Sequence, residues 1–136
     1  MHKTVLAFGT FDGLHDGHRS MLSQARSLAD RLVVAVPPDI NVMQRKGHFP
    51  NHIAQIRQLL VQAEDIADEV VYADKLIGKW KVLDRVKPDI VAIGYDQIEM
   101  ERSLRKFIKE NNLGINIVVL DAYKPSELHN SLLKTK

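Results

Sequence analysis

The sequence predicts an α/β fold: a single Rossmann-like, doubly wound parallel sheet of about five strands with helices on both faces. Two observations predict it. Short apolar runs recur along the chain, and segments with apolar residues at helical spacing separate them. Strands that are apolar throughout are typical of parallel sheets covered on both faces. With 136 residues, 45% of them hydrophobic, the chain has the size of one domain, and we expect residues 1–136 to form it.

The expected elements alternate along the chain. In order, they are a strand at 4–8, a helix from His18 to about Arg31, a strand at 32–36, a helix at 53–65, a strand at 69–72, a helix at 76–86, a strand at 90–93, a helix at 100–111 and a strand at 115–120. Pro37 and Pro38 end the second strand, and residues 39–50, which lack a clear apolar period, are predicted to form a loop. In such a sheet, ligands bind beyond the carboxyl ends of the strands.

Composition excludes several classes of protein. The 19 Lys and Arg against 17 Asp and Glu give a net charge of +2, which is too small to indicate a general nucleic-acid or membrane binder. The absence of cysteine excludes a disulfide framework, a thiolate nucleophile and a cysteine zinc site. No apolar run approaches the ~20 residues of a membrane span. We therefore expect a cytoplasmic protein whose partners are small molecules, without nucleic acid or membrane.

The most informative segment is 9–18, which reads Gly-Thr-Phe-Asp-Gly-Leu-His-Asp-Gly-His and joins the first strand to the first helix. Its three glycines let the backbone turn sharply and approach a ligand, and the free amides at the start of the helix favour a phosphate there. His15 and His18, three residues apart, can both donate hydrogen bonds to the same anion. The segment therefore predicts a phosphate site in which the two imidazoles stabilise charge.

This segment resembles the signature of the cytidylyltransferase-like nucleotidyltransferases. The resemblance implies that the histidines and the helix start hold a nucleoside triphosphate, while an acceptor phosphate attacks the α-phosphorus and pyrophosphate leaves. The signature usually reads His-Pro-Gly-His, and here Asp16 stands in the place of the proline. That carboxylate could weaken triphosphate binding, or it could cap the helix, since Asp is a preferred N-cap residue.

Two further segments extend the resemblance. Residues 87–97, Lys-Pro-Asp-Ile-Val-Ala-Ile-Gly-Tyr-Asp-Gln, are similar to a segment of the archaeal FAD synthases, small enzymes that adenylylate FMN. Residues 123–131 resemble the family's stretch at the start of the last helix, a second phosphate cradle to which Lys134 could add charge. The nucleotide-binding residues that the resemblance implies are Gly9, Thr10, Phe11, His15, Asp16, Gly17, His18, Asp96, Tyr123, His129, Asn130 and Ser131.

Some other side chains allow two interpretations. Lys46 stands where the wider family places a phosphate-binding lysine, so His15, His18 and Lys46 are the expected catalytic residues. Arg57 is near a frequently basic position, although Lys46 and Arg57 could equally be solvated charges. Asp12 could bind ligand or hold an Asx turn. Tyr72 and Trp80 are expected in the core or at a partner contact.

The resemblance implies an enzyme that transfers AMP from ATP to FMN, giving FAD and pyrophosphate. Mg²⁺ or another divalent cation would bridge the triphosphate oxygens, with no protein metal ligand assigned. An alternative is a cytidylyl- or adenylyltransferase that uses ATP or CTP and a glycerol phosphate or sugar phosphate. A non-catalytic nucleotide sensor is a third, suggested by Asp16 and by a chain that ends a few residues into the expected last helix. Family members are often dimers, so a homodimer is a possible assembly.

Overall fold

The computed structural model describes residues 3–76 and 78–122. Its five strands are all parallel and lie in the order β3-β2-β1-β4-β5. The strands are β1 (Thr4–Phe8), β2 (Arg31–Val36), β3 (Glu69–Tyr72), β4 (Ile90–Ile93) and β5 (Asn116–Val119). The helices are α1 (Asp16–Arg26), α2 (Asp39–Lys46), α3 (Ala54–Ala63), α4 (Val82–Val86) and α5 (Ile98–Glu110). The predicted fold class is confirmed.

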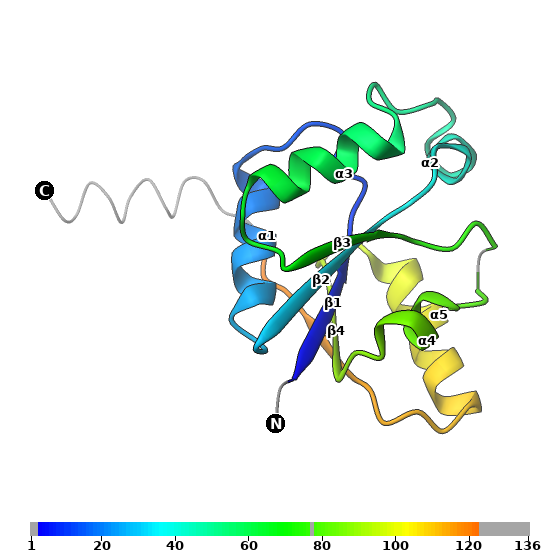
Figure 1. The fold of residues 1–136 in the computed structure, drawn as a ribbon. Coiled ribbons are helices and arrows are strands. Elements are labelled where there is room, and N and C mark those ends of the chain that lie inside the picture. The colour runs from blue at the N-terminus through cyan, green and yellow to red at the C-terminus, as the bar shows by residue number, and fades with distance from the viewer. Residues whose placement is uncertain (1–2, 77, 123–136) are drawn as a thin grey trace, which may run out of the picture.

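Helices cover both faces of the sheet, as Figure 1 shows. Val5 and Ala7 of the central strand β1 point into a core that they share with α1 and α3. Leu6 and Phe8 point the opposite way, into a core shared with α4 and α5. Because successive side chains of a strand alternate between faces, both faces of β1 must be apolar, which is why the run 4–8 has no alternating polar residues.

The chain reverses direction across the sheet at β1. From β1 it passes outward to β2 and β3, then returns to form β4 and β5 on the other side of β1. The connections that follow β1 and β4 therefore leave toward opposite faces and open a crevice at the carboxyl ends of these two strands. The motif at 9–18 and the segment 94–97 are the two connections at this point.

The predicted loop over residues 39–50 is wrong in its first part, which forms α2. This helix follows Pro38 at its N-cap and ends at Gly47, whose φ of 82° is left-handed. Val42 is its one buried residue, so the helix has no apolar stripe that could reveal a period. Its markers are instead the acidic first turn, the basic last turn and the terminal glycine.

Two other helices have boundaries that differ from the prediction. The helix expected at 76–86 begins only at Val82, because Trp80 has a φ of 51°, which a right-handed helix cannot accommodate. The main-chain amide of Lys81 instead donates to the Asp74 carboxylate. The first helix is displaced toward the motif: it begins at Asp16, two residues before the predicted start, and ends at Arg26.

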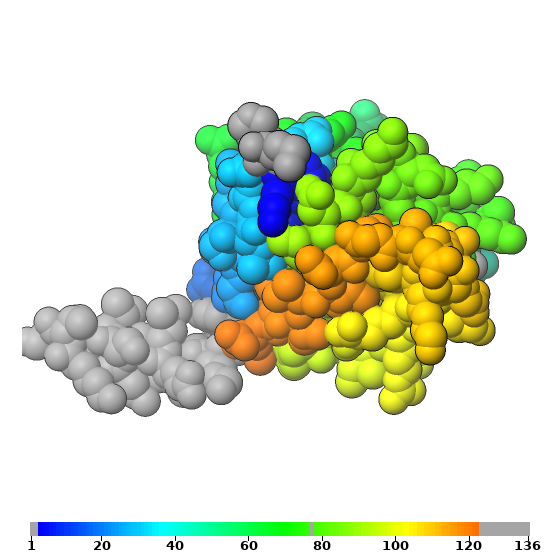
Figure 2. All heavy atoms as spheres, turned by 90° about the horizontal axis from the view of Figure 1, so that it is seen from below, coloured from blue at the N-terminus to red at the C-terminus, as the bar shows by residue number. Residues whose placement is uncertain are grey.

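At the amino ends of the strands, aspartates accept hydrogen bonds from main-chain amides. Asp30 accepts from Lys3 at 2.8 Å, Asp89 from Thr4 at 2.9 Å and Asp68 from Leu32 at 2.8 Å. Figure 2 views this edge from below, with the start of β1 in blue between the light-blue α1–β2 segment and the green segment before β4. Aspartate carboxylates therefore stabilise the amino ends of the strands, which lie at the edge of the sheet opposite the motif.

Within the described residues, no helix has the length and apolar character needed to cross a membrane.

Candidate active site

A side chain of the segment 94–97 joins the carboxyl ends of β1 and β4. Gln97 donates from Nε2 to the main-chain oxygen of Phe8 at 3.1 Å and accepts at Oε1 from the amide of Gly94 at 2.7 Å. A Cβ on Gly94 would lie 3.1 Å from the Asp96 carboxylate and 3.2 Å from Gln97 Oε1. Gln97 thus ties the ends of β1 and β4 together, while Asp96 is left exposed beside them.

The first turn of the motif is built by the close packing of Phe11 on Gly9. Phe11 has a left-handed φ of 53°, and its side chain is 1% exposed. A Cβ on Gly9 would lie 2.4 Å from the Phe11 ring, so no other residue fits at position 9 without displacing that ring. Only the main chain of Phe11 is left for the nucleotide contact expected there. Its ring instead meets the His18 imidazole edge to face, with the centroids 5.1 Å apart.

The two histidines cap α1 reciprocally. His15 is the N-cap, and its Nδ1 accepts from the amides of Gly17 at 3.0 Å and His18 at 3.4 Å. The Nδ1 of His18 accepts in return from the amide of His15 at 3.3 Å. Because both Nδ1 atoms accept, each neutral ring carries its proton on Nε2, which is the atom left to donate to a ligand. The rings stack with their centroids 3.7 Å apart, so the two donors form one unit.

The environment of His18 favours its neutral form. Partial burial, the neighbouring His15 and the positive charge of Lys46 lower the pKa of His18 below its ordinary 6.5, against an opposing hydrogen bond to the Gly13 carbonyl. A neutral His18 has one ring proton, on Nε2, and the Gly13 carbonyl is its partner in this structure, so a phosphate oxygen would have to take the place of that carbonyl. Lys46 is therefore close enough to His18 for its charge to act on that imidazole.

Asp16 does not cap the helix, so that interpretation is wrong. His15 holds the N-cap position, and Asp16 is the first helical residue, where its negative charge interacts favourably with the helix dipole. Its carboxylate contacts Arg19 at 3.3 Å, and Arg19 in turn contacts Glu64 at 2.6 Å. The negative charge beside the motif is thus partly neutralised by a surface arginine.

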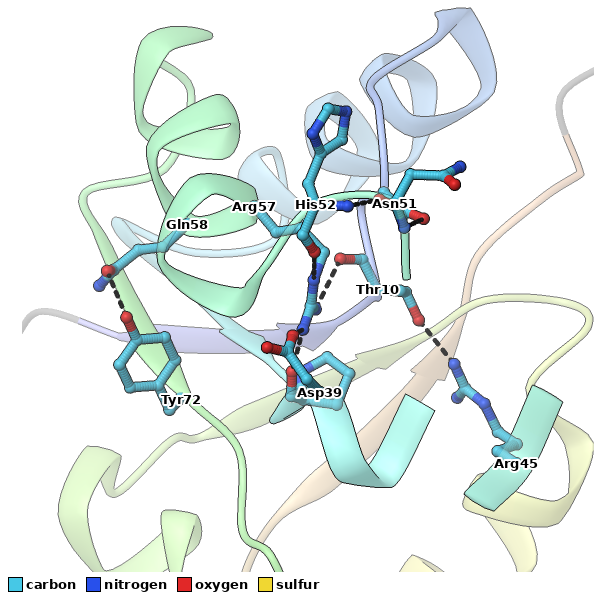
Figure 3. Close-up of polar contacts among 10 residues, drawn as sticks. Thr10, Asp39, Arg45, Asn51, His52, Arg57, Gln58 and Tyr72 are labelled. Carbon is cyan, nitrogen blue, oxygen red and sulfur yellow. Dashed lines mark hydrogen bonds and ion pairs between the residues drawn. The ribbon is translucent and has the colours of Figure 1, made fainter. Parts of the chain in front are cut away.

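A buried arginine holds the motif against its neighbours. Arg57 is 0% exposed and donates to the main-chain oxygens of His52 at 3.0 Å, Thr10 at 3.1 Å and Pro37 at 2.7 Å. It also contacts the Asp39 carboxylate at 2.8 Å. Figure 3 shows Arg57 reaching from α3 between Thr10 and Asp39. Each of the three side-chain nitrogens of Arg57 therefore donates inside the protein, and its complete burial excludes both a solvated charge and a phosphate ligand in this structure.

Asp12 adds a second set of contacts that hold the motif, and we call Asp12 and Arg57 together the clamp. Its carboxylate accepts from the amides of Asn51 at 2.7 Å and His52 at 2.8 Å, partners 39 and 40 residues away in sequence. Partial burial acts to raise the pKa of Asp12, but these two amides, with His52 and Arg57, outweigh it and hold the pKa below 3.8. Of the two interpretations of Asp12, the contacts favour the structural one, although the carboxylate holds the loop through long-range contacts and not through an Asx turn.

The last turn of α2 brings two cations to the motif. Lys46 is exposed near His18, and Arg45 Nη2 donates to the Thr10 hydroxyl at 2.6 Å. Figure 3 shows Arg45 approaching Thr10 from α2, on the side of Thr10 away from Arg57. Arg45 was not among the expected site residues, because its contact with Thr10 joins residues 35 positions apart in the sequence.

The structure brings together the expected residues of the motif with Lys46, and places Asp96 after the adjoining strand. Tyr123, His129, Asn130 and Ser131, together with Lys134, lie outside the described residues. Trp80 packs edge to face on Phe8 at 5.7 Å, as expected of a core residue. Tyr72 is 40% exposed, and its hydroxyl donates to Gln58 Oε1 at 3.0 Å.

Comparisons with known proteins agree with this geometry. A family model described as cytidylyltransferase-like matches residues 6–135. The FAD synthase of Aciduliprofundum boonei is 35% identical over 127 residues, covering 93% of this chain and 84% of that protein. The FAD synthase of Methanosarcina barkeri is 36% identical over 126 residues, covering 91% and 87%.

A solved structure shares the fold at similar identity. The lipopolysaccharide core biosynthesis protein from Thermoplasma volcanium GSS1 is 31% identical, with a TM-score of 0.82, and the match covers 91% of this chain and 100% of that chain. The family model spans nearly the whole sequence, and the relatives match over most of their length. The resemblance noted from the motif is thereby confirmed: the chain belongs to the cytidylyltransferase-like family.

Proposed function

We propose that this protein is an FAD synthase, which transfers AMP from ATP to the phosphate of FMN and releases pyrophosphate. The observation that carries the proposal is the stacked, reciprocally capped pair His15 and His18 at the start of α1, in which both Nδ1 atoms accept main-chain amides and Nε2 is the donor atom of each ring. The similarity to archaeal proteins named FAD synthase supports FMN as the acceptor.

The reaction requires positioning and charge stabilisation. An FMN phosphate oxygen attacks the α-phosphorus of ATP, forming the new P–O bond while the bond to the bridging oxygen breaks and pyrophosphate leaves. Negative charge grows on the nonbridging and leaving oxygens, where the two Nε2–H groups, the amides at the start of α1 and Lys46 stabilise it. No side chain forms a covalent intermediate in this scheme.

Mg²⁺ belongs to the proposal as a companion of ATP. The described residues contain no group of three His, Asp or Glu side chains arranged to hold a metal ion. A magnesium ion can be bound mainly by triphosphate oxygens and water, so the residues present are compatible with it. It would neutralise triphosphate charge when bound.

A second candidate acceptor is a sugar phosphate or glycerol phosphate, with ATP or CTP as donor. It is favoured by the likeness to the Thermoplasma protein named for lipopolysaccharide core biosynthesis. The same histidine pair would serve this reaction, because the chemistry at the α-phosphorus is unchanged. The acceptor distinguishes the two candidates.

A direct test incubates the protein with Mg²⁺, labelled ATP or CTP, and each acceptor in turn, and measures the nucleotide product together with pyrophosphate. FAD formation from ATP and FMN is expected. FAD at background level with strong formation of a cytidylylated glycerol phosphate would reject the proposal. Tight ATP binding without pyrophosphate release for any acceptor would instead indicate a sensor.

The homodimer is also a proposal, and the outer face of α3 supports it. Ile53, Ile56 and Leu59 are 57%, 40% and 51% exposed at successive turns of this face. The one charged residue in α3 is the buried Arg57. A two-fold axis brings like residues together, so a face without charge can pair with a copy of itself without repulsion.

The single domain and the cytoplasmic location expected from the sequence remain predictions.

A further inference from the structure

We propose that Arg45 binds the phosphate group of the acceptor, forming a subsite distinct from the histidine pair that holds the triphosphate. The inference rests on the proposed nucleotidyl transfer and adds where the second phosphate is held. It follows from the position of Arg45, from its charge environment and from the electrostatic demand of joining two phosphates.

Arg45 lies at the carboxyl end of β1. It is exposed in the last turn of α2 and reaches the Thr10 hydroxyl at 2.6 Å. Thr10 is the second residue after the central strand and the second of the motif that ends with His18. The guanidinium therefore stands at the opposite end of the motif from the start of α1, beside the same crevice.

The charge of Arg45 is unneutralised within the described part of the chain, where its polar contact is a neutral hydroxyl. Other arginines contact carboxylates, namely Arg19, Arg26, Arg31, Arg57, Arg85 and Arg105. A hydroxyl holds a guanidinium in place but leaves most of its five N–H donors and all of its charge for a ligand. The Thr10 hydroxyl thus holds Arg45 in place, while the charge and most N–H donors of Arg45 remain available for a ligand.

Nucleotidyl transfer needs such a cation. The attacking phosphate oxygen must come within ~3–3.5 Å of the α-phosphorus, although both groups are anionic. His15 and His18 lie at the start of α1, where they serve the triphosphate, and the charge of Lys46 acts on His18. Arg57 cannot serve the acceptor, because it is buried and its donors are used.

Arg19 also contacts the motif, but its partners are the carboxylates of Asp16 and Glu64. Arg45 contacts the motif through a neutral hydroxyl, and a guanidinium fork suits bidentate binding of a phosphate monoester. Binding there would place the acceptor on the β2 side of β1, since α2 follows β2. The contact with Thr10 would then orient the guanidinium before the acceptor arrives, so that less side-chain freedom is lost on binding.

The test compares two flavins that differ by the phosphate alone. The binding of FMN and of riboflavin is measured by flavin fluorescence in the wild type, Arg45→Gln, Arg45→Lys and Arg31→Gln. The last variant removes the same charge from the amino end of β2, at the opposite edge of the sheet. Arg45→Gln is expected to weaken FMN binding about tenfold or more, the usual effect of losing a charged hydrogen-bonded contact, while riboflavin binding stays unchanged. Arg45→Lys should restore part of the loss.

Steady-state FAD synthesis supplies the second readout. In Arg45→Gln the KM for FMN should rise by a similar factor, with the KM for ATP within about twofold of wild type and Tm unchanged. Equal weakening of FMN and riboflavin, or a rise confined to the KM for ATP, would overturn the subsite. A wild type that binds FMN more tightly than riboflavin but makes no FAD would reject the enzyme proposal and leave the subsite supported. A wild type that does not distinguish the two flavins would overturn the subsite itself.

Discussion

His15 and His18 each have two proposed roles, because Nδ1 of each ring accepts a main-chain amide at the start of α1 and Nε2 is the atom that would donate to the ligand. Removing either imidazole therefore removes a cap as well as a donor. We expect His15→Ala and His18→Ala each to lower kcat on the order of a hundredfold or more, the usual cost of one lost transition-state donor. The lost cap should cost only ~1 kcal/mol of stability.

A matched variant separates the two tasks. Asparagine is a good N-cap residue, so His15→Asn should retain the free energy of unfolding while still lowering kcat. Urea unfolding and initial rates, measured on the same preparations, check this. Turnover at the wild-type level in both alanine variants would remove the proposed catalytic roles.

The titration of His18 is a second prediction. Because the folded pKa of His18 lies below 6.5, the unfolded chain binds more protons than the folded one in the window between the two values. The stability linked to His18 is therefore fully present above pH 6.5 and is lost as the pH falls through the folded pKa. NMR of the imidazole should show a midpoint below 6.5 and the Nε2–H tautomer at pH 7. A midpoint above 6.5, or an Nδ1–H tautomer, would contradict the capping geometry.

Gly9 gives a prediction at the base of the motif. Its missing side chain leaves room for the Phe11 ring, which in turn supports His18. Gly9→Ala should destabilise the protein by about 1–3 kcal/mol, the usual cost of overpacking, and should lower kcat by displacing His18. Gly114→Ala is the control, since a Cβ there would meet nothing within 4 Å. Equal stability and activity in the two variants would show that the ring can move freely.

Among the elements, the strands were the easiest to predict. The apolar runs of β1 and β4 are buried on both faces, and this burial is what makes such runs continuous in the sequence. The helix α2 was missed because a helix with one buried residue carries almost no periodic signal. The start of α4 was wrong because the left-handed backbone at Trp80 depends on contacts such as that between Lys81 and Asp74, which are not visible locally.

The site was predictable only where its parts are adjacent in sequence. His15, His18 and the glycines lie within ten residues, so their spacing indicates the phosphate site. The clamp formed by Asp12 and Arg57 joins groups up to 47 residues apart, and most of its partners are main-chain atoms, which have no sequence identity to recognise. The sequence therefore placed Arg57 near a frequently basic position of the family but could not distinguish a structural role from phosphate binding.

Arg57 links three elements, and its loss should be costly. Arg57→Met would leave the carbonyls of Thr10, Pro37 and His52 without this donor and Asp39 without its cation. We expect a loss of about 3 kcal/mol in the free energy of unfolding, as for breaking a buried ion pair. The control Arg105→Met removes an exposed helical pair and should cost ~0.5 kcal/mol or less. Urea unfolding of both variants measures the difference; similar small losses would contradict the clamp.

At the scale of the whole molecule, the two ends of the strands have different roles, and so do the two faces of the sheet. The carboxyl ends of the strands carry the candidate site, and the amino ends are closed by Asp30, Asp68 and Asp89. The layer of α1 and α3 buries one face of the sheet, yet α3 also presents apolar side chains outward. An apolar helix face on the outside of the molecule is a candidate for contact with a partner, and assembly through it would leave the crevice beside β1 accessible.

The assembly can be tested through α3. If Ile56 and Leu59 pack against the same face of a second copy, the protein should have about twice the chain mass of 15.4 kDa in light scattering after size exclusion. Leu59→Glu would place like charges opposite one another across the two-fold axis, and this variant should have the mass of one chain. Ile98→Glu, at an equally exposed apolar position on α5, should keep the wild-type mass. A wild type of one-chain mass at concentrations up to about 100 μM, far above a micromolar Kd, would reject the dimer.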